Sequence, residues 1–168
     1  NADDFSLGVV GDTPLSPETF ITIRNRSGGA ASIVFSGTVP TVEVATNIVS
    51  SSTVRQDNLV ANPFPAAFTL SNSNLVSSGA FSSSADPFSP TDTLFVYTDT
   101  TGVRPGPTKS FIYYDGSQGG DAGWYDANDF GLGLQGSYSI PAGAALVIRK
   151  AVGTDVSVAW SPALPYTL

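Results

Sequence analysis

The stretch DFGLGLQGSYSIPAGAALVIRKAVGTDVSVAWSPALPY, Asp129 to Tyr166, has a counterpart at the other end of the chain. That counterpart, Asp4 to Thr41, reads DFSLGVVGDTPLSPETFITIRNRSGGAASIVFSGTVPT. An offset of 125 positions aligns 38 pairs without a gap, and 11 of these pairs are identical. Because glycines, apolar residues and one arginine keep the same spacing, the pattern indicates an internal repeat, 4–41 and 129–166.

The repeat divides the chain into two parts. Residues 1–53 are expected to form an N-terminal half-module, a β hairpin plus a strand, and residues 54–168 a complete β module. Unpaired strand edges and exposed apolar faces are costly, so a half-module needs a partner. We expect the two parts to pack together as one domain, or the half-module to be completed by a neighbouring subunit.

The composition excludes several classes of function. Only 12% of the residues are charged, the net charge is −7, and Cys, His and Met are absent. No basic stripe is available for phosphates, so nucleic-acid binding is excluded. Thiolate and imidazole metal sites and His-based catalysis are excluded as well. No G-x-S-x-G nucleophile motif is present, and we expect no enzyme and no resident cofactor.

The same composition bears on location. Hydrophobic residues make up 41% of the chain, which favours a folded protein over a disordered one. No apolar run approaches the about 18 residues of a membrane span, so no membrane insertion is expected. Because the chain has no Met, Asn1 is interpreted as a processed end. We expect an exported bacterial protein, extracellular or at the cell surface.

Short alternating stretches of β-branched and aromatic residues predict the fold, and no helical period of 3.6 residues is found. The prediction is an all-β antiparallel sandwich or jelly-roll-like barrel. Prolines at 63 and 65 predict an irregular segment over 55–65, and the Ser-rich stretch 71–90 predicts a long loop or a short helix. The expected strands are 20–24, 31–36, 42–49, 67–70, 92–98, 109–114, 124–126, 145–150 and 156–161.

Four motifs occur in a recognisable order: RQDNLVANPFP, a DTLFVY strand, a KSFIYYDG…GWYD hairpin and a closing AGAALVIRK strand. In that order they resemble the C-terminal part of an uncharacterised paralogous family of secreted proteins expanded in verrucomicrobial bacteria. The resemblance covers most of the chain. It implies export and an all-β fold, and it carries over no catalytic residue.

Oxygen ligands gather in the Gly-rich stretch after residue 114. Asp115, Asp121 and Asp126 are candidate ligands for Ca²⁺, which binds carboxylates on flexible loops. The spacing matches no EF-hand. The simpler interpretation is a hairpin turn in which the Asp side chains accept backbone N–H bonds.

Two further groups of residues are candidate sites. Trp124 and Tyr125 are a candidate platform for sugar rings, although large aromatic residues also fill the cores of small sandwiches. Trp160 aligns with Phe35 in the repeat, which indicates core packing. Arg24 and Arg149 are equivalent in the repeat, and pairing with an equivalent acid such as Asp4 and Asp129 is favoured over anion binding.

The incomplete N-terminal module gives the leading functional hypothesis: a structural protein that self-assembles into a fibre or surface layer. Its strands would pair head to tail with a neighbouring subunit, a contact that propagates as a filament. The alternative is a secreted glycan-binding module, assisted by calcium. The residues expected at the subunit interface are Phe5, Leu7, Phe20, Ile21, Ile23, Ile33 and Phe35.

Overall fold

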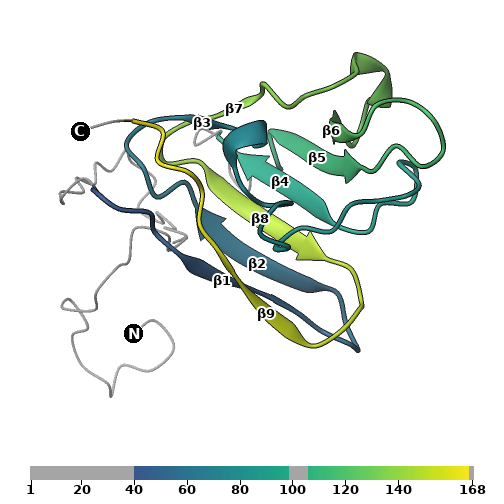
Figure 1. The fold of residues 1–168 in the computed structure, drawn as a ribbon, viewed down its shortest axis with the longest axis horizontal. Helices are drawn as coiled ribbons and strands as arrows, with labels where there is room; N and C mark the ends of the chain where they lie inside the picture. Colours follow the sequence, from purple (N-terminus) through teal and green to yellow (C-terminus); the bar gives the residue numbers. More distant parts are fainter. Residues whose placement is uncertain (1–39, 99–105, 167–168) are drawn as a thin grey trace, which may run out of the picture.

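The computed structural model describes residues 40–98 and 106–166, and in them the fold is antiparallel and almost entirely β. A five-stranded sheet has the order β2-β8-β4-β5-β6 (Figure 1). The ribbon β1-β9 and the short pair β3-β7 are separate two-stranded sheets. The five strands of the large sheet are β2 (Gln56–Ala61), β8 (Ala145–Lys150), β4 (Thr93–Tyr97), β5 (Lys109–Tyr114) and β6 (Gly123–Asp126).

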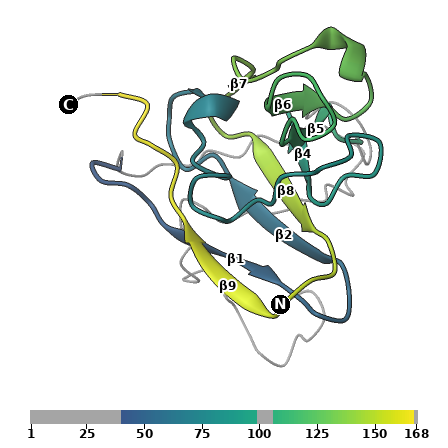
Figure 2. The same cartoon turned by 45° about the vertical axis from the view of Figure 1, so that its right-hand side comes forward.

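The remaining elements are β1 (Thr46–Ser50), β9 (Val156–Trp160), β3 (Phe68–Thr69), β7 (Ser139–Ile140) and the short 3₁₀ helices η2 (Leu70–Asn72) and η3 (Phe130–Leu132). Seen from two directions, the β1-β9 ribbon runs along β2 and β8 at one end of the sheet (Figures 1 and 2). The predicted all-β antiparallel class is confirmed, and the arrangement is sandwich-like.

One continuous core joins the ribbon to the sheet. Alternate side chains of each strand point to opposite faces, so one face of the sheet packs into the core and is mostly apolar. On that face lie Val60, Leu94, Val96, Phe111, Leu146 and Ile148, all at most 3% exposed. The ribbon adds Ile48 and Trp160 to the same cluster. Trp160 is 1% exposed, which confirms its predicted place in the core.

The opposite face of the large sheet is called the outer face here. At the β5-β6 end it is covered by Phe130 of η3, whose ring stacks on Tyr125 at a centroid distance of 4.1 Å. Ile112 and Tyr114 complete this small second cluster. At the β2-β8-β4 end, the part of the chain that the structure describes leaves the outer face hollowed and open.

Most predicted strands are found within a residue or two, but one prediction was wrong. Residues 55–65, expected to be irregular, contain the strand β2. The three polar residues Gln56-Asp57-Asn58 obscured the alternation of apolar and polar side chains that marks a strand. Asn58 occupies an inward position, where it hydrogen-bonds the backbone of Val49 instead of presenting an apolar group. The strand expected over 42–49 is β1, Thr46–Ser50.

One strand pair joins the two parts into which the sequence divides the chain. Strand β1 falls in the expected half-module 1–53, and it pairs with β9 of the expected complete module. The hairpin expected over 20–24 and 31–36, and nearly all of the first repeat copy 4–41, lie outside the described residues.

Candidate functional site

The open half of the outer face holds a groove of about 310 Å³ across strands β2, β8 and β4. The outward positions of these strands combine apolar and aromatic side chains with the ion pair of Asp57 and Arg149. Leu59 is 57% exposed there, whereas Val147 is 9% exposed. The groove is lined by Asp57, Leu59, Phe95, Tyr97, Pro107, Val147 and Arg149.

Arg149 is fixed at the centre of the groove. Its Nε and Nη2 each donate to one carboxylate oxygen of Asp57 at 2.8 Å, a two-point geometry that holds the guanidinium plane. The guanidinium carbon also lies 5.0 Å from the ring centroid of Phe95, within cation–π range. The pairing forms because Asp57 is the direct cross-strand partner of Arg149 in the β2-β8 ladder.

This pair corrects the expected partner of Arg149. Asp129 instead accepts the backbone N–H of Gly131 at 3.1 Å and so begins η3. The hydrogen bonds from Arg149 lower the pKa of Asp57, and those to Asp57 raise the pKa of Arg149. Both groups therefore stay charged at neutral pH. Arg24 lies outside the described residues.

The groove combines two kinds of contact. The rings of Phe95 and Tyr97 offer apolar faces, and the Asp57–Arg149 pair offers charged hydrogen-bonding groups whose side chains are each 40% exposed. Flat aromatic surface beside a fixed polar pair suits a ligand that is both apolar-faced and rich in hydroxyl groups.

The three candidate calcium ligands do different things in the structure. Asp115 accepts the backbone N–H of Ser117 at 2.8 Å, and hydrogen bonds from Ser117 hold the pKa of Asp115 below its usual value. This is the turn that the simpler interpretation predicted. The backbone carbonyl of Asp121 accepts the Tyr125 hydroxyl at 2.8 Å.

Asp126 is paired with a lysine rather than poised for a metal. Lys109 Nζ lies 2.8 Å from the Asp126 carboxylate, which also accepts the backbone N–H of Asn128 at 2.9 Å. Burial by itself would raise the pKa of Asp126, but these hydrogen bonds outweigh it and the pKa is lowered. Among residues 40–98 and 106–166, no group of three His, Cys, Asp or Glu side chains is placed to hold a metal ion.

Trp124 and Tyr125 are buried, at 4% and 6% exposure. Trp124 packs against Phe81 at 4.9 Å between ring centroids and edge-on against Tyr113 at 5.4 Å. Tyr125 stacks on Phe130. The pair therefore does not present the exposed platform for sugar rings that the sequence suggested. Phe95 and Tyr97 line the groove beside Arg149, whereas Trp124 and Tyr113 border a second hollow of about 410 Å³ next to η2.

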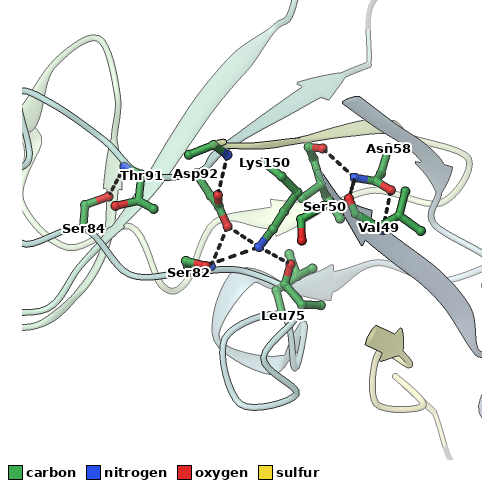
Figure 3. Close-up of polar contacts among 12 residues, drawn as sticks. Val49, Ser50, Asn58, Leu75, Ser82, Ser84, Thr91, Asp92 and Lys150 are labelled. Atoms are coloured by element: carbon green, nitrogen blue, oxygen red, sulfur yellow. Dashed lines mark hydrogen bonds and ion pairs between the residues drawn. The ribbon is translucent and has the colours of Figure 1, made fainter. Parts of the chain in front are cut away.

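A second set of polar groups lies inside the protein (Figure 3). Lys150, at the end of β8, contacts the carboxylate of Asp92 and donates to the carbonyl of Ala80 at 3.0 Å. Asp92 also accepts the backbone N–H groups of Ser82 at 2.7 Å and Ala151 at 3.0 Å. Every charge of the pair is thus partnered, so this cluster holds structure together and leaves no group free for a ligand.

The expected subunit-interface residues, Phe5, Leu7, Phe20, Ile21, Ile23, Ile33 and Phe35, lie outside the described residues. Within the described ranges, no helix has the length and apolar character needed to cross a membrane. No protein-family model, curated protein or solved structure matches the chain, and the resemblance to the verrucomicrobial family stays a prediction.

Sequence reasoning missed the groove because it missed β2. Once Gln56–Ala61 is a strand, the outward positions Asp57 and Leu59 follow from alternation. The strand expected over 92–98 placed Phe95 and Tyr97 on one face in the same way. The signal was therefore present in the sequence, but it needed the β2-β8 pairing to be assembled.

Proposed function

We propose that this chain is an extracellular structural protein that assembles head to tail, by β-strand pairing between subunits, into a fibre or surface layer. The observation that carries the proposal is the edge of β9. In the described part of the chain β9 pairs only with β1, so its other edge offers unpaired backbone N–H and C=O groups.

Within residues 40–98 and 106–166, the β9 edge lacks the usual protection against strand addition. Edge strands of soluble proteins commonly carry lysine or proline, or are covered. The sequence of β9 is Val-Ser-Val-Ala-Trp, with no charged residue and no proline. Val156 is 48% exposed, and Ser157 and Ala159 are exposed as well. Such an edge accepts a further strand readily.

A strand from the N-terminal part of one subunit, added to the β9 edge of the next, gives a contact between two different surfaces. A contact of this type does not close on itself and propagates as a filament. The low charge of the chain and its lack of Cys support an inert extracellular material.

Negative-stain electron microscopy of the full chain tests the proposal. We expect filaments from the native sequence and none from Ser157→Lys/Ala159→Lys, because two lysines on the β9 edge repel an incoming strand. The matched control is Ser83→Lys/Ser89→Lys, which adds the same charge at exposed positions on either side of Ser84, whose backbone bridges to Tyr114 of β5. Uniform small particles of the native chain, or filaments that persist in the β9 variant, would contradict the proposal.

Glycan binding is a second candidate, favoured by the groove beside Arg149 rather than by Trp124 and Tyr125. Sugar rings present an apolar face and several hydroxyl groups, which matches Phe95 and Tyr97 beside the Asp57–Arg149 pair. Glycan-array screening followed by calorimetry tests it. We expect Tyr97→Ala to lose binding and Phe88→Ala, an exposed aromatic residue that lines neither hollow, to keep it. The absence of any bound glycan with the native chain would exclude this second function.

A further inference from the structure

We infer that the side chain of Phe88 in one copy of this chain inserts into the groove beside Arg149 in a second copy. The groove lies across β2, β8 and β4, whereas Phe88 packs against η3 at the β5-β6 end of the same face. The two surfaces are thus at opposite ends of the five-stranded sheet (Figure 1). This contact goes beyond the filament contact of the proposed function, because it uses neither the β9 edge nor an N-terminal strand.

Phe88 is an exposed apolar anchor. Among residues 40–98 and 106–166 it is the most exposed of the large hydrophobic side chains, at 85%. One side of its ring is supported by Phe130, at a centroid distance of 6.1 Å, and Leu132 extends the apolar surface at 54% exposure. Aromatic residues are enriched where proteins contact each other, because their burial is strongly favourable. The surface around Phe88 therefore suits a protein contact.

A short turn holds Phe88 in this projecting position. The Asp86 side chain accepts the backbone N–H of Phe88 at 2.9 Å, and the Asp86 carbonyl accepts the N–H of Ser89 at 3.3 Å. Pro87 and Pro90 restrict the backbone on both sides of the ring. Because the turn is already ordered, little conformational entropy is lost when Phe88 binds, and association costs less free energy.

The groove has the room and the chemistry for an aromatic ring. Its volume is about 310 Å³, and a cavity of about 150 Å³ is enough to hold benzene. Leu59 and Phe95 give it apolar walls. The guanidinium of Arg149 lies over the Phe95 ring and is held by Asp57. Arginine stacks on aromatic rings, so a second ring can pack beside a guanidinium that is already in place.

Four carboxylates lie around the Phe88 turn. One is in the turn, one directly precedes Phe130, and two belong to the β5-β6 connection, where Ser117 Oγ donates to the carbonyl of Ala85 at 3.4 Å. None of the four takes part in an ion pair within residues 40–98 and 106–166. Two copies that met through this same surface would bring like charges together, which is unfavourable. The four carboxylates are Asp86, Asp115, Asp121 and Asp129.

The groove end of the sheet offers cations instead. The Arg149 side chain is 40% exposed and has N–H groups that Asp57 does not use. Arg55, two residues before Asp57, is exposed and adds a second cation beside the groove. The acidic surface around Phe88 thus complements the groove of another copy. Charge favours this occupant over a neutral sugar.

The contact joins two different surfaces, so every copy keeps one free Phe88 turn and one free groove. A contact of this kind does not close on itself and adds copies along the direction of the sheet. A single inserted side chain gives a small interface, and small interfaces are weak and reversible. Association through this contact should therefore depend strongly on concentration.

Sedimentation equilibrium of the full chain tests the contact. Every protein in the series carries Ser157→Lys/Ala159→Lys, so that the β9 edge does not contribute. We expect the average mass to rise between about 10 µM and 1 mM. Phe88→Ser and Leu59→Glu should each weaken association by about tenfold to a hundredfold, since each removes the burial of one large apolar side chain.

Val42→Ser and Val152→Glu are the matched controls. Both valines are exposed, at 67% and 52%, and neither lines the groove or belongs to the Phe88 turn. These controls should associate as the parent protein does. Circular dichroism of each variant checks that it folds. Phe88 and Leu59 are more than half exposed, so their replacement leaves the core intact.

Mixing the two weakened variants tests whether the surfaces are complementary. Phe88→Ser keeps its groove and Leu59→Glu keeps its Phe88, so an equal mixture should form dimers that do not grow further. In nitrogen-15-labelled Phe88→Ser, unlabelled Leu59→Glu should shift the amide resonances of Tyr97 and Arg149. The same addition to labelled Leu59→Glu should leave these resonances unchanged.

Three outcomes would overturn the inference. The first is a parent protein that stays monomeric at 1 mM, including one whose groove binds a glycan instead. The second is Leu59→Glu that associates as strongly as the parent, which would mean that two Phe88 surfaces meet each other. The third is a mixture of the two variants that forms no dimer. Filaments of the native chain alongside any of these results would leave the β9 contact standing.

Discussion

The ammonium group of Lys150 is paired with the carboxylate of Asp92 inside the protein, where their side chains are 9% and 1% exposed. Lys150 ends the strand β8, and Asp92 immediately precedes β4, its neighbour in the sheet. Together they also bind Ala80 and Ser82. One ion pair thus ties the irregular segment around residues 80–82 to the centre of the sheet.

Lys150→Met should lower the free energy of unfolding by about 3–5 kcal/mol, since it leaves a buried carboxylate without its partner. Urea denaturation followed by Trp fluorescence measures this. The control Arg55→Met removes an exposed charge and should change stability by no more than about 0.5 kcal/mol. A similar loss in both variants would contradict a structural role for the pair. Lys150→Met/Asp92→Asn should recover much of the loss, because no lone charge remains buried and the amide oxygen can still accept a backbone N–H.

Asn58→Ala should separate the ribbon from the sheet locally. The Asn58 amide accepts the N–H of Val49 at 2.8 Å and donates to its carbonyl at 2.9 Å. Its removal should cost about 1–3 kcal/mol, the range for buried groups left unpaired. The amide proton of Val49 should also exchange faster. The control is Asn47→Ala, an exposed position on β1, the strand of Val49. Unchanged exchange at Val49 in Asn58→Ala would refute this link.

Acid should weaken the protein through Asp126 and, to a smaller extent, Asp57. The pKa of each carboxyl is lowered in the folded state from an ordinary value of 3.8. Their stabilising contribution is therefore full above that value and is lost as the pH falls through the lower folded pKa. The stability difference between the native chain and Asp126→Asn should shrink between pH 5 and pH 2, as measured by urea titrations. A constant difference would show that the Lys109 contact contributes nothing.

Calcium should leave the melting temperature unchanged. The Asp126 carboxylate is occupied by Lys109 and Asn128, and an Asp115 oxygen accepts the Ser117 N–H. Thermal unfolding with EDTA and with millimolar CaCl₂ measures this, with MgCl₂ as the control for ionic strength. A melting temperature that rises with CaCl₂ but not with MgCl₂, and that no longer rises in Asp121→Asn, would instead establish the calcium site that the sequence suggested.

The strands 109–114 and 145–150 were predictable from sequence, since each contains a continuous run of apolar residues, Phe-Ile-Tyr-Tyr and Ala-Leu-Val-Ile, of strand length. Strand β2 was not, because two of its side chains are polar for reasons of pairing: Asn58 bonds the ribbon and Asp57 bonds Arg149. Such roles depend on which strands become neighbours, and local sequence carries no record of that.

The candidate site shows the same limit. Trp124 and Tyr125 were candidate ligand-binding residues because they are aromatic. Aromatic residues, however, occur both in cores and on binding surfaces, and only their burial in the structure distinguishes the two. The aromatic residues that line the groove, Phe95 and Tyr97, belong to a strand predicted correctly. They became a site only when β8 placed Arg149 beside Phe95 and β2 placed Asp57 opposite that arginine.

The antiparallel pairing of β1 with β9 also determines how the sandwich responds to mechanical force. Thr46 and Trp160 lie opposite each other, and the segments beyond them run on together to Pro40 and Tyr166, whose hydroxyl bonds the Pro40 carbonyl at 2.7 Å. A pull applied through residues 40 and 166 would therefore open the ribbon like a zipper, one pair after another. The Tyr166 hydroxyl bond would be loaded first, and the anchored Trp160, whose indole N–H bonds the Ser73 carbonyl, would follow. A fibre of such subunits would yield gradually at this seam while the five-stranded sheet stays intact.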